Sequence, residues 1–175
     1  MDKYKTTMHR FWAGVVDGVI LIPLGWVDDL VYGPARPTAL IIAWMLISYP
    51  AYWLYGVLMH GFYGQTLGKM LLKVKVLDVS EAPITMRQAF LRDSIYILIN
   101  TAAVIISIYY LLSGRQIDDG AITTSYIVLS TAALAWFLAE ILTCLTNPKR
   151  RALHDFIAGT VVVKTEPLPA EEGKV

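Results

Sequence analysis

A charged pair lies inside the first apolar run of this chain and limits what the chain can fold into. The run covers residues 10–27, and Asp17 lies seven residues after Arg10. Seven residues make about two helical turns, so both charges share one face with the small residues Ala13 and Gly14 between them. A charge at the centre of a membrane helix costs about 3 kcal/mol on insertion scales. The run therefore predicts a membrane helix whose polar face turns toward other helices.

Three further apolar runs are long enough to cross a bilayer, which takes about 20 residues. The composition agrees, because 56% of the 175 residues are hydrophobic and only 17% are charged, against about 25% charged in a soluble domain. We predict an all-α membrane protein in which residues 1–165 form a four-transmembrane-helix bundle, with helices near 10–27, 38–59, 86–112 and 122–146. Residues 166–175, rich in glutamate and proline, are predicted to be disordered.

The distribution of basic residues predicts how the bundle is oriented. The two short connections, 28–37 and 113–121, hold one arginine each, and the other basic residues lie in the terminal segments, in the loop 61–91 or directly after it at Arg92. Positive charge is retained in the cytoplasm, so both termini and this loop are expected there. The net charge of +1 gives no reason to expect a nucleic-acid partner; the expected surroundings are the lipid bilayer.

The loop and the C-terminal segment contain their own local signals. Residues 73–77 alternate with a period of two, and residues 160–164 are rich in valine, so we predict that they pair as a small cytoplasmic β-element. Thr85, with Gln88 three residues later, predicts a capping box and a helix that starts near Met86.

Polar residues follow each other at three- and four-residue steps on the predicted helices and should meet in one seam. We predict that Asp17 pairs with Arg92, and that Arg10 pairs with Asp93 or Asp155. Such pairs either lock the bundle or form part of a cation or proton pathway. The candidate cluster comprises Arg10, Asp17, Arg92, Asp93, Asn100, Glu140, His154 and Asp155.

Glu140 has no obvious basic partner at its depth, which makes it the strongest candidate for a titrating group; the alternative is a neutral glutamate hydrogen-bonded across helices. His154 can titrate near neutral pH beside Asp155 or serve as a hydrogen-bonded structural residue. No metal-ligand spacing and no nucleophile–base pair is visible, so we expect neither an enzyme nor a bound metal or cofactor. The single cysteine, Cys144, excludes an intrachain disulfide and is expected to be buried.

The loop motif Gly64-x-Thr66-x-Gly68-Lys69 invites comparison with a phosphate-binding loop. It does not fit, because three residues rather than four separate the glycines and Met70 follows the lysine. The glycines are expected to form a turn or to allow close backbone packing.

Four motifs in order resemble the RDD family of bacterial membrane proteins. They are Arg10-x-x-Ala13-x-x-x-Asp17, the loop motif, Arg92-Asp93 and His154-Asp155. The resemblance covers about residues 8–164 and implies that Arg10 and Asp17 are family residues, with a second family aspartate at Asp93 or Asp155. It also implies a multi-pass protein of the bacterial inner (plasma) membrane. The chain departs from the family in two ways: the turn at residues 79–82 lacks a glycine, and four helices are expected rather than three.

Two hypotheses for function follow. Some family members are similar to cation/proton antiporters, which implies an exchanger of monovalent cations and protons that acts as a homo-oligomer through Asp17 and Glu140. Others look like helpers of membrane complexes, which implies a non-catalytic scaffold or assembly factor for a partner.

Overall fold

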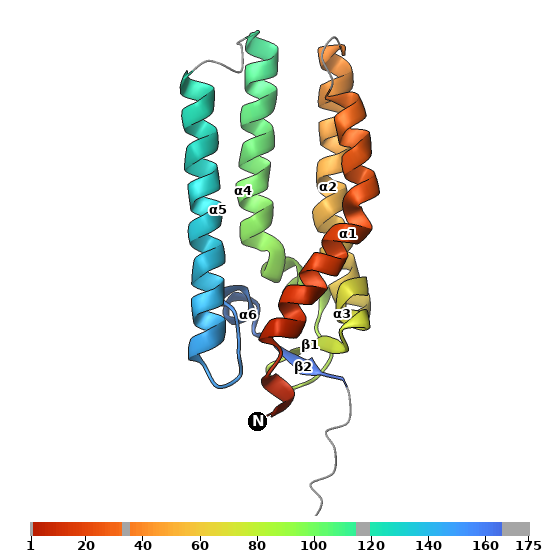
Figure 1. The fold of residues 1–175 in the computed structure, drawn as a ribbon, viewed down its shortest axis with the longest axis vertical. Coiled ribbons are helices and arrows are strands. Elements are labelled where there is room, and N and C mark those ends of the chain that lie inside the picture. The colour runs from red at the N-terminus through yellow and green to blue at the C-terminus, as the bar shows by residue number, and fades with distance from the viewer. Residues whose placement is uncertain (1, 33–35, 115–119, 166–175) are drawn as a thin grey trace, which may run out of the picture.

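Four long helices extend in one direction from a compact end that holds two short helices and two strands (Figure 1). This computed structural model describes residues 2–32, 36–114 and 120–165. The elements are η1 (Asp2–Tyr4), α1 (Thr7–Val31), α2 (Thr38–Tyr63), α3 (Leu67–Leu71), β1 (Val74–Asp78), α4 (Met86–Ser113), α5 (Gly120–Thr146), α6 (Leu153–Ala158) and β2 (Thr160–Lys164).

Three of the described helices are long and apolar enough to cross a membrane: Thr38–Tyr63, Met86–Ser113 and Thr124–Thr146. The predicted second and third helices therefore begin where expected, and the second extends four residues further. The helix α1 has 25 residues but contains Arg10 and Asp17, and it is not among the three. Four spans and the cytoplasmic orientation of the termini stay predictions. The predicted disordered tail, 166–175, lies outside the described residues.

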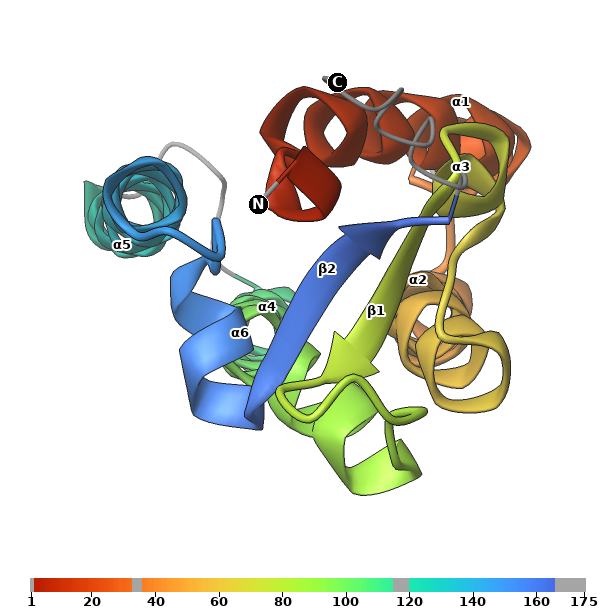
Figure 2. The same cartoon turned by 90° about the horizontal axis from the view of Figure 1, so that it is seen from below.

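The two strands pair as predicted and form an antiparallel ribbon across the ends of the helices (Figure 2). Val74 lies opposite Lys164, and Asp78 lies opposite Thr160. Two strands alone are marginally stable, so the ribbon depends on what covers it. Four successive residues of β2 are buried, because the N-terminal segment packs on the strand and the Thr6 hydroxyl donates to the Val162 carbonyl at 3.5 Å.

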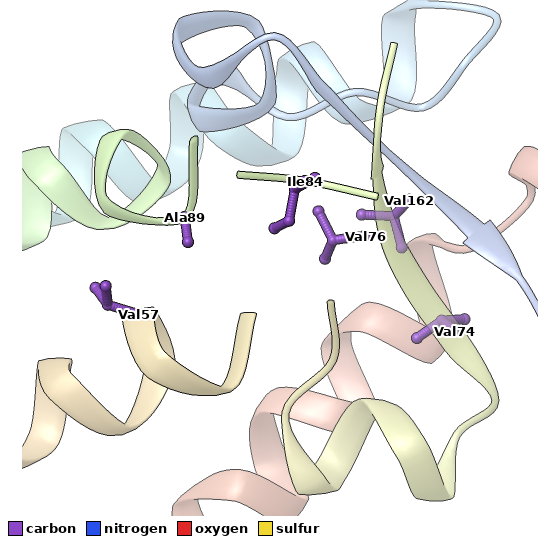
Figure 3. Close-up of a cluster of buried hydrophobic side chains, with 6 residues drawn as sticks. All are labelled: Val57, Val74, Val76, Ile84, Ala89 and Val162. Carbon is purple, nitrogen blue, oxygen red and sulfur yellow. The ribbon is translucent and has the colours of Figure 1, made fainter. Parts of the chain in front are cut away.

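A cluster of buried apolar side chains joins this ribbon to the helices (Figure 3). Trp53 and Ile97 pack against its edge. Burial of apolar surface away from water stabilises this end of the molecule, in contrast to the apolar helix faces that remain exposed along the bundle. The cluster consists of Val57, Val74, Val76, Ile84, Ala89 and Val162.

The connection from β1 to α4 forms a tight turn without glycine. Glu81 adopts φ +67°, a conformation that few residues other than glycine take. The Asp78 amide donates to the Ala82 carbonyl at 2.8 Å, and the Glu81 carboxylate accepts from the Tyr4 hydroxyl at 2.5 Å. The capping box that follows is confirmed, since Thr85 and Gln88 exchange side-chain and backbone hydrogen bonds and α4 begins at Met86.

Candidate functional site

A buried carboxylate, Asp155 at the start of α6, is the centre of the charge cluster. Arg10 contacts its Oδ2 at 2.7 Å, and Arg92 pairs with its Oδ1. The Ala152 amide donates to Oδ2 at 2.9 Å, and the Thr160 hydroxyl donates to Oδ1 at 3.1 Å. Burial by itself would raise the pKa of Asp155, but the two guanidinium groups outweigh it and hold that pKa well below its usual range.

These contacts decide between the predicted ion pairs. Of the two alternatives for Arg10, Asp155 is confirmed and Asp93 is wrong. The predicted pair between Asp17 and Arg92 is also wrong. The helix α6 packs against α4, so Asp155 rather than Asp17 is the carboxylate that contacts Arg92.

The hydrogen bonds of His154 define its tautomer. Arg10 and Arg92 each place an Nη2 atom 3.0 Å from His154 Nε2. A guanidinium can only donate, so Nε2 accepts and the ring proton lies on Nδ1, which donates to Glu140 Oε1 at 2.5 Å. Burial lowers the pKa of His154 against the opposing effect of Asp155, which agrees with a neutral imidazole.

The expectation that Glu140 has no basic partner is therefore wrong. The turn after α5 returns the chain beneath that helix, so His154 reaches Glu140 from α6. The Tyr96 hydroxyl donates to the other carboxylate oxygen at 3.2 Å. Glu140 is thus hydrogen-bonded across helices.

Asp17 connects α1 to the loop motif. Its carboxylate accepts from the Tyr55 hydroxyl at 2.8 Å, from the Thr66 hydroxyl at 2.6 Å and from the Gly68 amide at 2.8 Å. The motif itself provides the turn and the close approach expected of it. Gly64 ends α2 with φ +71°, Thr66 caps α3, and Gly68 packs against α1.

Replacing Asp17 with asparagine should lower the free energy of unfolding by about 1–3 kcal/mol. Both carboxylate oxygens accept hydrogen bonds, so the amide nitrogen of asparagine would face a donor instead of an acceptor. Denaturant unfolding in detergent measures this loss. The exposed Asp29→Asn variant, at the other end of the same helix, is the matched control. Equal stability of the two variants would contradict this role for Asp17.

A pocket of about 460 Å³ lies between α1, α4 and α5 at the compact end of the bundle. Its walls include apolar side chains such as Phe11, Phe137 and Ile141. The polar lining combines two acids, two histidines, a lysine and arginines, and includes His60, Lys69, Arg92, Asp93, Glu140 and His154.

Within this pocket, Lys69 Nζ lies 2.7 Å from His60 Nε2, and His60 Nδ1 lies 4.0 Å from Asp93 Oδ2. Over the described part of the chain, His60 Nδ1 and Asp93 Oδ2 are buried atoms without a hydrogen-bond partner. Asp93 thus joins the site but in a different pairing from the predicted one. Asn100 does not join it: the residue is exposed, and its amide donates to the Tyr96 carbonyl at 2.7 Å within the same helix.

Sequence reasoning missed His60 altogether. The only signal was a polar residue near the end of an apolar run, and its partner Lys69 reaches it because Gly64 reverses the chain between them.

Among the described residues, no three His, Cys, Asp or Glu side chains gather in a way that could hold a metal ion. Cys144 is buried as expected, and its thiol donates to the Arg150 carbonyl at 3.1 Å.

A model described as the RDD family matches residues 4–159, which is nearly the whole chain. No curated protein and no solved structure matches the chain.

Proposed function

Because this chain belongs to the RDD family of membrane proteins and gathers its titratable groups in one pocket, we propose that it is a cation/proton exchanger. In this proposal Asp93 binds a proton or a monovalent cation in turn, and Glu140 is a second acid that binds a proton. The protein has no enzymatic activity and works as a homo-oligomer.

The state of Asp93 is the observation that carries the proposal. A carboxylate that binds the exchanged cation needs an oxygen that is not used by structural donors. The Asp93 side chain lines the pocket and is 27% exposed, and its buried Oδ2 atom makes no hydrogen bond to the described chain. Asp17 fails this requirement, because three donors occupy its oxygens, so Asp93 replaces it in the exchange hypothesis.

Glu140 is the second acid because its partner is a neutral imidazole. The Nδ1–H group of His154 donates to Glu140 Oε1 at 2.5 Å, and because this imidazole is neutral it does not cancel the charge of the carboxylate. Both acids line the same pocket, so a proton on one and a cation near the other would influence each other.

Orientation and assembly complete the proposal. The basic residues of the termini and of the loop 61–91 favour a cytoplasmic location for the pocket end, in the bacterial inner membrane. The few apolar helices of one copy are too few to surround a continuous transport path. A second copy would therefore provide the remaining wall of that path.

Reconstitution in liposomes with an internal pH dye tests exchange. A sodium or potassium gradient should drive proton flux in the wild type, and both Asp93→Asn and Glu140→Gln should remove most of it. The exposed Asp29→Asn variant should retain the wild-type flux. Absence of flux in the wild type, or equal flux in all four proteins, would overturn the proposal.

A non-catalytic scaffold is the second candidate. It is supported by the ion pairs of Asp155 with Arg10 and Arg92, which join α1, α4 and α6 and occupy both oxygens of this carboxylate. Crosslinking in native membranes should then recover one stoichiometric partner, whereas recovery of the protein alone would count against a scaffold.

A further inference from the structure

Three titratable side chains from three elements lie in a row along one wall of the pocket. Lys69 comes from α3, His60 from α2 and Asp93 from α4. The first link is a 2.7 Å contact between Lys69 Nζ and His60 Nε2. The second joins His60 Nδ1 to Asp93 Oδ2 at 4.0 Å. His60 is only 5% exposed, so the row passes through the protein rather than through bulk water.

The contact between Lys69 and His60 determines which nitrogen of the imidazole carries the proton. A lysine ammonium group can only donate, so His60 Nε2 accepts and the ring proton lies on Nδ1. This proton then faces Asp93 Oδ2, and neither atom has a hydrogen-bond partner within the described residues. A distance of 4.0 Å exceeds a hydrogen bond, but a small rotation of the ring or one bridging water closes it.

Gly56 holds the carboxylate in this place. It lies one helical turn before His60 on α2, and a Cβ at Gly56 would stand 3.3 Å from Asp93 Oδ2. The absence of a side chain therefore lets Asp93 lie against the α2 backbone beside the imidazole.

The charges around Lys69 prepare it to release a proton. Among the described residues, no carboxylate lies within 4.0 Å of its ammonium group. Burial, followed by the neighbouring Arg92 and Arg10, lowers the pKa of Lys69 to about 8, against the opposing effects of Asp93 and Asp17. The charged or titratable groups near His60 are Asp93, Lys69, Arg92, His154 and Asp155.

We propose that Lys69, His60 and Asp93 form a proton-transfer chain that couples the cation site to water. Lys69 gives a proton to His60 Nε2 while His60 Nδ1 gives its proton to Asp93 Oδ2. The products are a neutral amine, a neutral imidazole with its proton on Nε2 and a protonated carboxyl, so the total charge stays zero. The neutral carboxyl releases its cation, and Lys69 takes a new proton from water. This inference rests on the proposed exchange and names the groups that couple it.

The first test measures Lys69 directly in the wild-type protein. Acetic anhydride modifies only neutral amines, so mass spectrometry of Lys69 across a pH series gives its titration midpoint. We expect a midpoint near 8 that falls in Asp93→Asn, because a nearby negative charge is removed. The exposed Lys149 is the control, and its modification should not respond to Asp93→Asn. An ordinary midpoint for Lys69, or one that does not respond to Asp93→Asn, would overturn the chain.

The second test separates the chain from the exchange itself. Lys69→Arg keeps the positive charge but cannot release its proton, so it should lose proton flux in liposomes near neutral pH while Lys149→Arg keeps it. Wild-type flux in Lys69→Arg would overturn the chain and leave the exchange function standing. A wild type without flux, whose Lys69 midpoint still responds to Asp93→Asn, would overturn the exchange function and leave the coupling of these groups standing.

Discussion

The Asp155→Asn variant is expected to lose about 3–5 kcal/mol of stability, because it leaves two buried guanidinium groups without their common counter-charge. The substitution preserves the shape of the side chain, so the loss reports the charge. Glu81→Gln is the control, since it removes an exposed carboxylate that pairs with Lys3 at the surface and should leave the unfolding temperature nearly unchanged. Unfolding of the two variants in detergent measures the difference.

The same carboxylate predicts a pH dependence. The pKa of Asp155 is lower in the folded protein than in the unfolded chain, so its contribution is fully present above the unfolded value of about 3.9. It is lost as the pH falls from there through the folded pKa. Wild-type stability should therefore decline in this acidic range, and Asp155→Asn should show a smaller decline. Parallel curves for the two proteins would contradict this account.

Gly68→Ala should cost about 3 kcal/mol, at the upper end of what overpacking usually costs. A Cβ at this position would overlap the Ala13 carbonyl oxygen and would lie 2.9 Å from the Asp17 carboxylate. Backbone cannot yield as a flexible side chain does, so α3 must move away from α1. The Asp17 hydrogen bonds to Thr66 and Gly68 would then weaken together.

Gly14→Ala provides the matched control for that variant. Gly14 is also close in sequence to Ala13, but a Cβ there would meet nothing within 4 Å. Alanine favours a helix interior by about 1 kcal/mol over glycine, so this variant should be as stable as the wild type or slightly more stable. Thermal unfolding of both variants checks the contrast, and an equal loss in both would mean that the contact with α1 is not the cause.

Local signals in the sequence predicted much of the fold. The capping box at Thr85 and Gln88 depends on residues three apart, and the valine-rich strands carry their own pattern, so both could be read without knowing the rest. The loop motif was also interpreted correctly as a place of close packing, because Gly68 has no side chain to separate the backbones.

The partners of the charges could not be predicted in the same way. Spacing along one helix places Arg10 and Asp17 on a face, but the choice of partner depends on how α3 and α6 fold back. These helices have only five and six residues, and their positions follow from packing rather than from their own sequences. For this reason Asp17 was assigned to Arg92, although the loop motif supplies its donors.

The pairing of β1 with β2 has a consequence for biosynthesis. Asp155 and β2 follow the four long helices in the sequence, whereas β1, Arg10 and Arg92 are made earlier. The two arginines therefore leave the ribosome before their counter-ion is synthesised. In the described chain β1 pairs only with β2, so β1 has no strand partner until β2 is synthesised. Assembly of this end must be completed after translation has reached β2, so a truncation that removes β2 should trap the inserted helices in an unfinished state.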